Sequence, residues 1–412
     1  MAYEHMSSNP EQEATKEYLI NSILDNAQIL IPENGVREKI RSAELEARPL
    51  RVKMGFDPTS PDLHLGHAVS MHQLRRFQEL GHTPVIIIGD FTGRIGDPTG
   101  RNKSRPLANG EDLARNAETY IDQLSKVIDV SKVEIHYNSE WLENLKLADL
   151  IHILAQGTLS QTITRDDFRK RLEENSPIAL HEIIYPYLQG LDSLAIDADI
   201  EVGGVDQLYA FQAARLLQGS KDIDPEALVL MPLLRGLDGE KKMSKSLGNY
   251  IGLSDEPENM FGKVMSIPDV LIEEYLRLAS SFSADEINEL TTRVQEGNAM
   301  DVKLRLAFDI VKTYHSSEAA DGALDYFNKQ FRSKSLEDQV YEDVTVEQGD
   351  SLSDVLVKQG VVDSYSKARR LFQQGGVRVE GEKISFEQSQ ALTSLNGLKI
   401  RVGKKNFFKI NQ

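Results

Sequence analysis

The feature that most constrains the fold is a strand–helix–strand unit in the first quarter of the chain. Arg51–Phe56 is short, apolar and followed by Asp-Pro, which predicts a strand that ends in a turn. Gly66–Leu80 has the helical period, and Pro84–Gly89 (PVIIIG) is a continuous β-branched run of the kind buried in parallel sheets. Together these three segments predict a βαβ unit.

The alternation continues beyond this unit. Helical stretches separate three further candidate strands, which are Val133–Tyr137, Ile200–Val202 and Leu228–Leu233. Such alternation predicts an α/β domain with a Rossmann-like, doubly wound parallel sheet. We expect this domain to span residues 1–252. It would begin with a helix over residues 1 to about 35, because Glu13–Ile31 is apolar at helical spacing.

The remainder of the chain has a different character. Residues 253–343 are helical in period and rich in Glu, Leu and Ala, which predicts a helical domain. Glu342–Asp350 is acidic with little apolar content, which predicts a linker. Residues 350–412 predict a compact module with 11 Lys/Arg and 6 Asp/Glu, although the whole chain has a net charge of −17. A basic module on an acidic body is typical of a local nucleic-acid contact, and chance clustering on a solvated surface is the alternative.

Composition excludes several classes of protein. The chain has no cysteine, which excludes disulfides and thiolate chemistry. It has no run of about 18 apolar residues, so we expect no membrane-spanning helix. Met1–Lys16 is polar and acidic without an apolar core segment, which argues against export. We therefore expect a cytoplasmic protein.

The first motif that could carry chemistry is PTSPDLHLGH, at Pro58–His67 between the first strand and its helix. Gly66 removes a side chain where a ligand could approach the backbone. His64 and His67 lie three apart at a helix N-terminus, which favours anions, so they suit a phosphate or a phosphoryl-transfer transition state. The alternatives are a helix cap with two ordinary histidines, or a metal pair. We predict no metal site, because no cysteine and no third nearby acidic ligand supports one.

The second motif is GEKKMSKSLGNYI, at Gly239–Ile251 after the last strand. It places Lys241, Lys242 and Lys245 among glycines and small hydroxyl residues. Such a loop is mobile and cationic, and it could close over a triphosphate and neutralise charge as pyrophosphate leaves. The alternative is an exposed lysine-rich loop.

HLGH and KMSKS, in this order and spacing, resemble the paired signatures of class I aminoacyl-tRNA synthetases. Over nearly the whole chain, the sequence is most similar to bacterial tyrosyl-tRNA synthetases. The resemblance implies ATP-dependent activation of tyrosine to tyrosyl-adenylate and transfer to the 3′-end of tRNA(Tyr), assisted by Mg²⁺. It also implies a homodimer. The implied catalytic residues are His64, His67, Lys242 and Lys245, and Thr59 and Gly66 would line the ATP site together with Lys245.

Two glycine-containing stretches match further parts of that family. In GDFTGRIGDPTGR (Gly89–Arg101), the resemblance implies that Asp97 binds the substrate ammonium and that Arg101 and Arg105 hold the pyrophosphate side or the tRNA. In VGGVDQ (Val202–Gln207), it implies that Asp206 binds the ribose and Gln207 the substrate. The alternatives are a plain glycine-rich turn and a turn with an aspartate cap.

The stretch YPYLQGLD places Tyr185, Gln189 and Asp192 on one helix face. Three polar side chains facing inward are costly unless a ligand satisfies them. The resemblance implies that Tyr185 and Gln189 hold the ammonium and that Asp192 accepts the phenolic O–H. Lys53 stands where many family members carry a tyrosine that also bonds the substrate hydroxyl, so we expect Lys53 to bind tyrosine. The alternative is a polar helix surface.

The C-terminal module resembles an S4-like, small α+β RNA-binding domain, over Ser351–Ile384. A cationic face would position RNA through its phosphates without reading bases, and its implied members are Lys367, Arg369, Arg370 and Arg378. A helix with an exposed basic side is the alternative.

Three rival functions stay open at this point. A tryptophanyl synthetase would share the fold, but Asp192 as a phenol acceptor argues against it. An inactive relative that binds RNA only through its tail is disfavoured by the intact HLGH and KMSKS motifs. An enzyme that activates an amino acid for another acceptor is disfavoured by the basic tail module.

Overall fold

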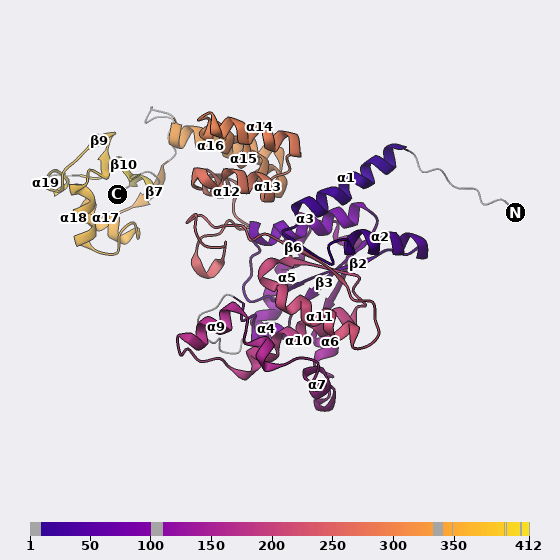
Figure 1. The fold of residues 1–412 in the computed structure, drawn as a ribbon. Helices are drawn as coiled ribbons and strands as arrows, with labels where there is room; N and C mark the ends of the chain where they lie inside the picture. The colour runs from indigo at the N-terminus through magenta and orange to yellow at the C-terminus, as the bar shows by residue number, and fades with distance from the viewer. Residues whose placement is uncertain are drawn as a thin grey trace. The chain divides into compact units, whose positions relative to one another are not determined.

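The computed structural model describes residues 10–99, 110–332, 341–347, 349–390, 392, 394–403 and 406–411. The chain forms two compact units, Met1–Ser317 and Glu318–Gln412 (Figure 1). The three-domain division at residues 252 and 343 stays a prediction.

The first unit is built on a six-stranded sheet with the order β1-β6-β5-β2-β3-β4. Strands β2 to β6 are mutually parallel, whereas β1 at the edge pairs antiparallel with β6. All five predicted strands are present. The strand bounds are β1 Ile29–Ile31, β2 Arg51–Phe56, β3 Thr83–Ile88, β4 Glu134–Tyr137, β5 Ile200–Gly204 and β6 Ala227–Met231.

The strand order fixes where a ligand can bind. From β2 the chain continues to one side through β3 and β4, and β5 and β6 lie on the other side. The direction of winding therefore reverses between β2 and β5, and ligands of open α/β sheets bind at the carboxyl ends of the strands at such a point. Lys53 in the middle of β2 lies directly opposite Val85 of β3 and Glu201 of β5.

Helices cover the sheet and carry its functional side chains. The helices α10 and α11 flank β5 in the sequence and pack closely, since a Cβ added to Gly190 of α10 would lie 3.0 Å from the backbone nitrogen of Ala214 in α11. The helices that precede the lysine loop are α1 Pro10–Asn26, α2 Gly35–Glu46, α3 Leu65–Glu79, α4 Thr92–Ile95, α5 Gly110–Leu124, α6 Ser139–Leu142, α7 Leu147–Leu154, α8 Leu159–Thr162, α9 Asp166–Glu173, α10 Leu180–Ala195 and α11 Leu208–Gly219.

The prediction of one N-terminal helix over residues 1 to about 35, beside a purely parallel sheet, is wrong. The helix α1 ends at Asn26, and Ile29–Ile31 forms the edge strand β1. Pro32 follows β1, and a proline disfavours the helical conformation of the residue before it. The three apolar residues pair with Leu228–Leu230 of β6 instead, so the sheet is mixed.

Helices follow the last strand of the sheet, as the periodicity predicts. Their bounds are α12 Pro257–Met265, α13 Ile272–Ala279, α14 Ala284–Gln295, α15 Ala299–Tyr314 and α16 Ser317–Phe327. Leu276, Leu306 and Ile310 are completely buried, so these helices present apolar faces to a core.

The second unit contains a five-stranded sheet with the order β7-β11-β10-β8-β9. Its elements are β7 Glu342–Thr345, α17 Leu352–Lys358, α18 Tyr365–Gln373, β8 Val377–Val379, β9 Glu382–Lys383, α19 Phe386–Gln390, β10 Lys399–Val402 and β11 Asn406–Asn411. The predicted linker is wrong for its first residues, because β7 pairs with β11 and buries Val344 in the core of this unit. The alternation of Val344 and Val346 with polar residues is the strand signal that the acidic composition hides.

Among the residues that the structure describes, no helix is both long enough and apolar enough to cross a membrane.

Candidate active site

A cavity of about 330 Å³ lies at the carboxyl ends of β2 and β5, where the strand order predicts a ligand. The structure brings 11 of the predicted site residues together on its wall. They are Thr59, His64, Gly66, His67, Asp97, Tyr185, Gln189, Asp192, Asp206, Gln207 and Lys242.

The remaining predicted residues lie elsewhere. Lys245 lies beside the wall and donates to the hydroxyl of Ser60. Lys53 does not line the cavity and is completely buried behind it. Arg101 and Arg105 fall outside the described residues. The four predicted RNA-binding residues belong to the second unit, and Lys367, Arg369, Arg370 and Arg378 are exposed there.

The two histidines form a stacked pair at the start of α3. His64 precedes the first turn of the helix, and its backbone N–H donates to Nδ1 of His67 over 3.2 Å. The ring centroids lie 3.8 Å apart. A Cβ at Gly66 would approach the His64 ring to 3.0 Å, so glycine leaves the face of the ring open. Nδ1 of His64 is buried and has no hydrogen-bond partner among the residues that the structure describes, which leaves it available to a ligand.

Both imidazoles are neutral in this site. Burial lowers the pKa of His64 to about 3, and the charges of Lys245 and Lys242 act in the same direction. Burial and the neighbouring His64 hold the pKa of His67 well below its usual range. The pair can therefore exchange hydrogen bonds with a ligand, while the positive charge at this end of the cavity comes from the lysines.

The lysine loop lies against the histidine motif. Backbone hydrogen bonds join the two segments, from Leu65 N to Ile251 O (3.0 Å) and from Leu253 N to Leu63 O (2.9 Å). The side chain of Met243 is only 4% exposed, and its burial anchors the loop between Lys242 and Lys245. Segments almost 190 residues apart in the sequence thus form one surface.

Two lysines of the loop have specific partners. Lys242 forms an ion pair of 2.7 Å with Asp206, at the end of β5. Lys245 Nζ lies 2.5 Å from the hydroxyl of Ser60, and burial lowers its pKa to about 8 against the opposing charge of Asp62. Lys245 is therefore a partly desolvated cation, and such a group interacts more strongly with an anion than a fully hydrated one.

The opposite end of the cavity is acidic. Asp192 on α10 is only 3% exposed, and it accepts hydrogen bonds from Trp141 Nε1 (2.9 Å) and Asn138 Nδ2 (3.3 Å). Burial raises its pKa to about 7, although Lys53 and these two donors oppose the rise. A buried carboxyl with such a raised pKa on a cavity wall is a strong candidate for ligand recognition.

Between Asp192 and the histidines, further polar groups face the cavity. The hydroxyl of Tyr185 donates to Asp57 over 2.8 Å, and Gln207 Nε2 donates to Asp97 over 2.7 Å. Oε1 of Gln189 is buried without a hydrogen-bond partner among the described residues. These oxygen atoms together offer a binding place for a cationic donor such as an ammonium group.

Sequence reasoning missed four residues of this site: Asp57, Thr92, Asn138 and Trp141. Thr92 donates to Asp57 over 2.8 Å and accepts from Asn138 over 2.9 Å, which links the two ends of the polar wall. A signal for two of them was present, because Asp57 directly follows β2 and Asn138 directly follows β4. Polar residues at the carboxyl ends of parallel strands are expected at a ligand site. No comparable signal marks Thr92 or Trp141.

Within the described part of the chain, no group of three or more His, Cys, Asp or Glu side chains could hold a metal ion.

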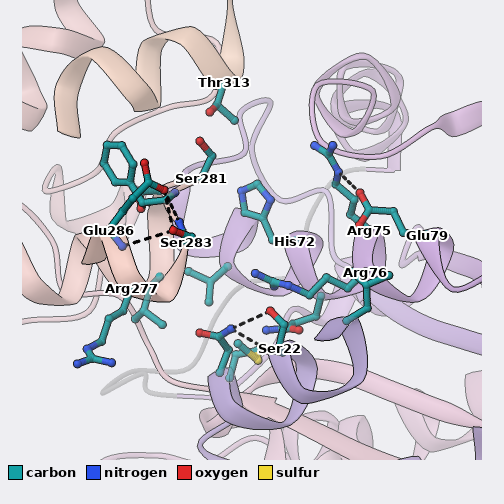
Figure 2. A pocket seen from close by; sticks show the side chains of 18 of the residues that line it. Ser22, His72, Arg75, Arg76, Glu79, Arg277, Ser281, Ser283, Glu286 and Thr313 are labelled. Atoms are coloured by element: carbon teal, nitrogen blue, oxygen red, sulfur yellow. Dashed lines mark hydrogen bonds and ion pairs between the residues drawn. The ribbon is translucent and has the colours of Figure 1, made fainter. Parts of the chain in front are cut away.

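A second cavity of about 490 Å³ is lined by residues of α1, α3, α13, α14 and α15 (Figure 2). Several of its polar groups are paired with each other. Arg75 bonds Glu79 over 2.9 Å, and Ser283 and Glu286 bond each other at the start of α14. None of the predicted site residues lines this cavity.

The sequence and the fold both match known proteins. Residues 45–332 match the family described as tRNA synthetases class I (W and Y). The chain is 45% identical over 388 residues to the tyrosine–tRNA ligase of Carboxydothermus hydrogenoformans, covering 92% of this chain and 94% of that protein. It is 42% identical over 400 residues to the tyrosine–tRNA ligase of Thermotoga maritima, covering 96% of this chain and 98% of that protein.

Solved structures share the fold at low sequence identity. The tyrosyl-tRNA synthetase of Archaeoglobus fulgidus, crystallised with L-tyrosine, superimposes with a TM-score of 0.59 at 22% identity, covering 75% of this chain and 99% of that chain. A C-terminally truncated mitochondrial tyrosyl-tRNA synthetase from Aspergillus nidulans also gives a TM-score of 0.59, at 20% identity, covering 76% of this chain and 98% of that chain.

The environment of the histidine pair predicts that His64 stays neutral in the folded protein from pH 5 to 8, because burial and two lysines lower its pKa to about 3. Nitrogen-15 NMR of the labelled protein should show His64 without a titration midpoint in that range. The same protein in urea is the control, where the histidines should titrate near 6.5. Since the unfolded chain then binds protons first, the folded state should lose stability as the pH falls below about 6.5. A His64 midpoint at or above pH 6 would contradict the argument.

Proposed function

The chain belongs to the tyrosine–tRNA ligases of the class I tRNA synthetases, and on this premise we propose which residues carry out the reaction. Enzymes of this family activate tyrosine with ATP and attach it to tRNA. The observation that carries the assignment of roles is the placement of Asp192 and the unpaired Gln189 at one end of the cavity that holds the His64–His67 pair and Lys242 at the other.

The acidic end is assigned to the amino acid. Asp192 accepts the phenolic O–H of tyrosine, because its two present donors leave lone pairs on both carboxylate oxygens. Gln189 accepts from the ammonium group through its unpaired Oε1, together with Asp97 and the hydroxyl of Tyr185. Gln207 orients Asp97 through their hydrogen bond of 2.7 Å.

This arrangement supports tyrosine over phenylalanine and tryptophan. Phenylalanine would leave a buried acceptor without its partner, and an unpaired buried polar group carries a large desolvation penalty. An enzyme of this same type is the standard example of such discrimination. Tryptophan fits less well, because its single N–H donor lies on a larger ring system. The cavity of about 330 Å³ must also hold part of the nucleotide.

The basic end is assigned to ATP. The open face above Gly66 and the unpaired Nδ1 of His64 provide contacts for a phosphate at the N-terminus of α3. Thr59 lies on the same wall, and Lys245 carries the partly desolvated positive charge. Asp206 at the end of β5 accepts from the ribose, as is usual for an acidic residue at a strand end in this type of fold.

The ion pair between Lys242 and Asp206 links the two roles. Both side chains are partly exposed, at 39% and 21%, so the pair can open without a large loss of stability. When the ribose hydroxyls replace Lys242 as partners of Asp206, the ammonium group of Lys242 becomes free to turn toward the triphosphate. Binding of the nucleotide would thus bring the positive charge of Lys242 to the phosphates at the same time.

The reaction then has two steps. The tyrosine carboxylate attacks the α-phosphate of ATP in line, which forms tyrosyl-adenylate and releases pyrophosphate. A terminal ribose hydroxyl of the tRNA attacks the carbonyl of the adenylate and releases AMP. Neither step needs a nucleophile from the protein, so catalysis consists of positioning and of charge stabilisation by His64, His67, Lys242 and Lys245.

Mg²⁺ is expected with ATP, but the described residues offer no three-ligand cluster for it. Such an ion prefers phosphate oxygens and water to an all-protein cage. We therefore assign no catalytic step to an ion held by the protein.

The second unit is assigned to tRNA, as an S4-like RNA-binding domain. Its helix α18 buries Ala368 and Phe372 and leaves Lys367, Arg369 and Arg370 exposed on the other side. Arg378 is exposed on the neighbouring strand β8. A cationic surface on one helix and one strand suits phosphate contacts. Arg101 and Arg105 are assigned to the pyrophosphate side or the tRNA on the family resemblance alone.

A homodimer is supported by apolar residues that the first unit leaves exposed. The helix α7 (LADLIHIL) has no buried residue, although its composition is apolar. Exposed large hydrophobic side chains recur in this part of the chain, at Leu147, Ile151, Leu159, Leu172 and Leu180. Exposed apolar side chains that recur in one part of a chain are typical of an interface, and we assign them to a contact with a second copy of the chain. We place this enzyme in the cytoplasm, where tRNA is charged.

Replacing Asp192 by Asn should lower kcat/KM for tyrosine in pyrophosphate exchange by roughly 10- to 150-fold, the equivalent of about 1.5–3 kcal/mol for a hydrogen bond to a charged group. Exchange with all twenty amino acids should show tyrosine as the preferred substrate of the parent. Asp197→Asn, at an exposed position of the same segment, is the control and should have no effect. Unchanged tyrosine kinetics in Asp192→Asn would remove the proposed phenol acceptor.

Lys245→Ala should slow the burst of tyrosyl-adenylate formation by removing positive charge from the leaving pyrophosphate. The expected loss is about 2–4 kcal/mol, or roughly 30- to 1,000-fold in rate, by analogy with the loss of an oxyanion donor. Rapid quench with labelled ATP measures it. Lys241→Ala is the matched control, because Lys241 is exposed in the same loop. A burst rate of Lys245→Ala within twofold of the parent excludes this role.

The double variant Arg370→Ala/Arg378→Ala should bind tRNA more weakly and with a salt dependence reduced by about one to two ions, since each lost phosphate contact lowers the slope by about 1. Filter binding over a salt series measures both quantities. Pyrophosphate exchange without tRNA should stay unchanged. Lys358→Ala serves as control, because Asp350 and Glu347 already neutralise this lysine. Unaltered tRNA binding in the double variant would argue against the assigned surface.

A further inference from the structure

A buried cluster of charged side chains lies directly behind the acidic end of the cavity. Lys53 of β2 is 0% exposed, and its Nζ lies 2.8 Å from Oε1 of Glu201 on β5. It also donates to the hydroxyl of Ser193 over 2.8 Å. That hydroxyl in turn donates to Glu226, just before β6, over 3.1 Å. A cluster of this kind is unfavourable for stability unless its members are paired, so its presence needs a reason.

The cluster holds the segment of α10 that faces the amino acid. Lys53 Nζ donates to the backbone carbonyl oxygen of Gln189 over 3.2 Å. It also donates to the hydroxyl of Ser193, the residue that directly follows Asp192. One ammonium group on the central strand of the sheet thus contacts the helix at both ends of the Gln189–Ser193 turn. The two side chains assigned to the substrate project from this same turn, and Lys53 itself does not reach the cavity.

The charges in this region do not balance without a proton. Three carboxyl groups, Asp192, Glu201 and Glu226, face the single positive charge of Lys53. Burial and the nearby Glu201 raise the pKa of Glu226 well above its usual range, which favours the neutral form of Glu226. Burial opposes the charged form of Lys53, but the neighbouring carboxylates outweigh it and raise its pKa.

Lys53 and Glu201 act on Asp192 in opposite directions. The positive charge of Lys53 favours the carboxylate form, whereas burial and the negative charge of Glu201 favour the neutral form. Other groups reach the same site from the surrounding elements. They are Trp141 and Asn138 as donors to Asp192, and Tyr185, Asp57 and Asp97 across the cavity.

We propose that Lys53 is a positioning residue that sets the preference for tyrosine over phenylalanine without touching either, by holding the Gln189–Ser193 turn in place and favouring the ionised form of Asp192 on it. The proposal rests on the function proposed above, in which Asp192 accepts the phenolic O–H. Phenylalanine has no phenolic O–H to donate to Asp192. The loss of this donor lowers the affinity for phenylalanine strongly when Asp192 is ionised, and less when Asp192 is neutral. The charge of Lys53 therefore acts on selectivity through Asp192.

The test is Lys53→Met, compared with the parent in pyrophosphate exchange with tyrosine and with phenylalanine from pH 6 to 9. At pH 7 the variant should show a KM for tyrosine raised by about fivefold or more, with kcat nearly unchanged. A rise of one pKa unit from a midpoint near 7 lowers the ionised fraction of Asp192 from about one half to about one eleventh. The tyrosine-to-phenylalanine ratio of kcat/KM should fall by a similar factor. The pH midpoint of KM, near 7 in the parent, should move upward, so that the tyrosine affinity recovers at high pH.

A second variant predicts a shift of opposite sign. Glu201→Gln/Glu226→Gln removes the two carboxyl groups behind Asp192 and leaves the positive charge of Lys53 there unopposed, so the pH midpoint should move downward. General damage to the packing would change both variants in the same direction. If Lys53→Met does not fold, the sign of the shift in this second variant decides the question.

The proposal is overturned if the pH midpoints of KM for tyrosine in both variants stay within a few tenths of a pH unit of the parent. It is also overturned if they move in the same direction in both variants. This result differs from a failure of the proposed function. In that case the parent would not exchange pyrophosphate with tyrosine, or Asp192→Asn would retain the full tyrosine preference.

Discussion

The site depends on one short piece of backbone pairing, between residues 63–65 before α3 and residues 251–253 after the lysine loop. Leu63, Leu65, Ile251 and Leu253 are all completely buried, and two backbone hydrogen bonds of about 3 Å join the segments. His64 lies between the two leucines of the first segment, so it is held at the cavity while its neighbours point into the core. The same pairing fixes where the lysine loop ends, and a backbone hydrogen bond from Met243 N to Leu234 O (2.8 Å) holds its middle. The side chains of Lys242 and Lys245 can therefore move while the backbone beside them stays in place, which a loop that closes over a nucleotide requires.

This fixed frame separates charge within one small cavity. The lysines lie beside neutral imidazoles at one end, where Lys242 is paired with Asp206, and three carboxyl groups of the wall lie at or toward the other: Asp57, Asp97 and Asp192. Neutral histidines matter here, because two imidazolium ions beside Lys245 would repel each other and the lysine. A ligand with an anionic end and a cationic, hydroxyl-bearing end complements this field in one orientation only. ATP and tyrosine together have that distribution of charge, and their reacting atoms would meet near the middle of the cavity.

The parts of the fold that local periodicity controls could be predicted from the sequence. Strands β2 to β6 are apolar runs with turn signals at their ends, and both signature motifs are contiguous in the chain. The missed features depend on contacts that are distant in sequence. Trp141 reaches Asp192 from a short helix 51 residues earlier, and nothing in its local sequence indicates this. Lys53 was expected to touch tyrosine because its position matched a substrate-binding residue. Its side chain is buried with Glu201 and Glu226, which follow it by 148 and 173 residues, and their pairing can be seen only once the sheet is formed.

The polar groups behind the cavity give a physical reason for retaining charges that a stable core would otherwise exclude. An apolar residue at position 53 would pack in the sheet as Val52 and Met54 do, and replacing a buried ion pair by apolar side chains is often neutral or stabilising. The hydrogen bonds of Lys53 to Ser193 and to the Gln189 carbonyl would be lost by that replacement, and Asp192 would lose its only cationic neighbour among the groups that act on it. Asp192 would then become neutral over more of the physiological pH range, and the difference in binding free energy between tyrosine and phenylalanine would become smaller. The ion pair is therefore better explained by recognition of the substrate than by stability of the fold.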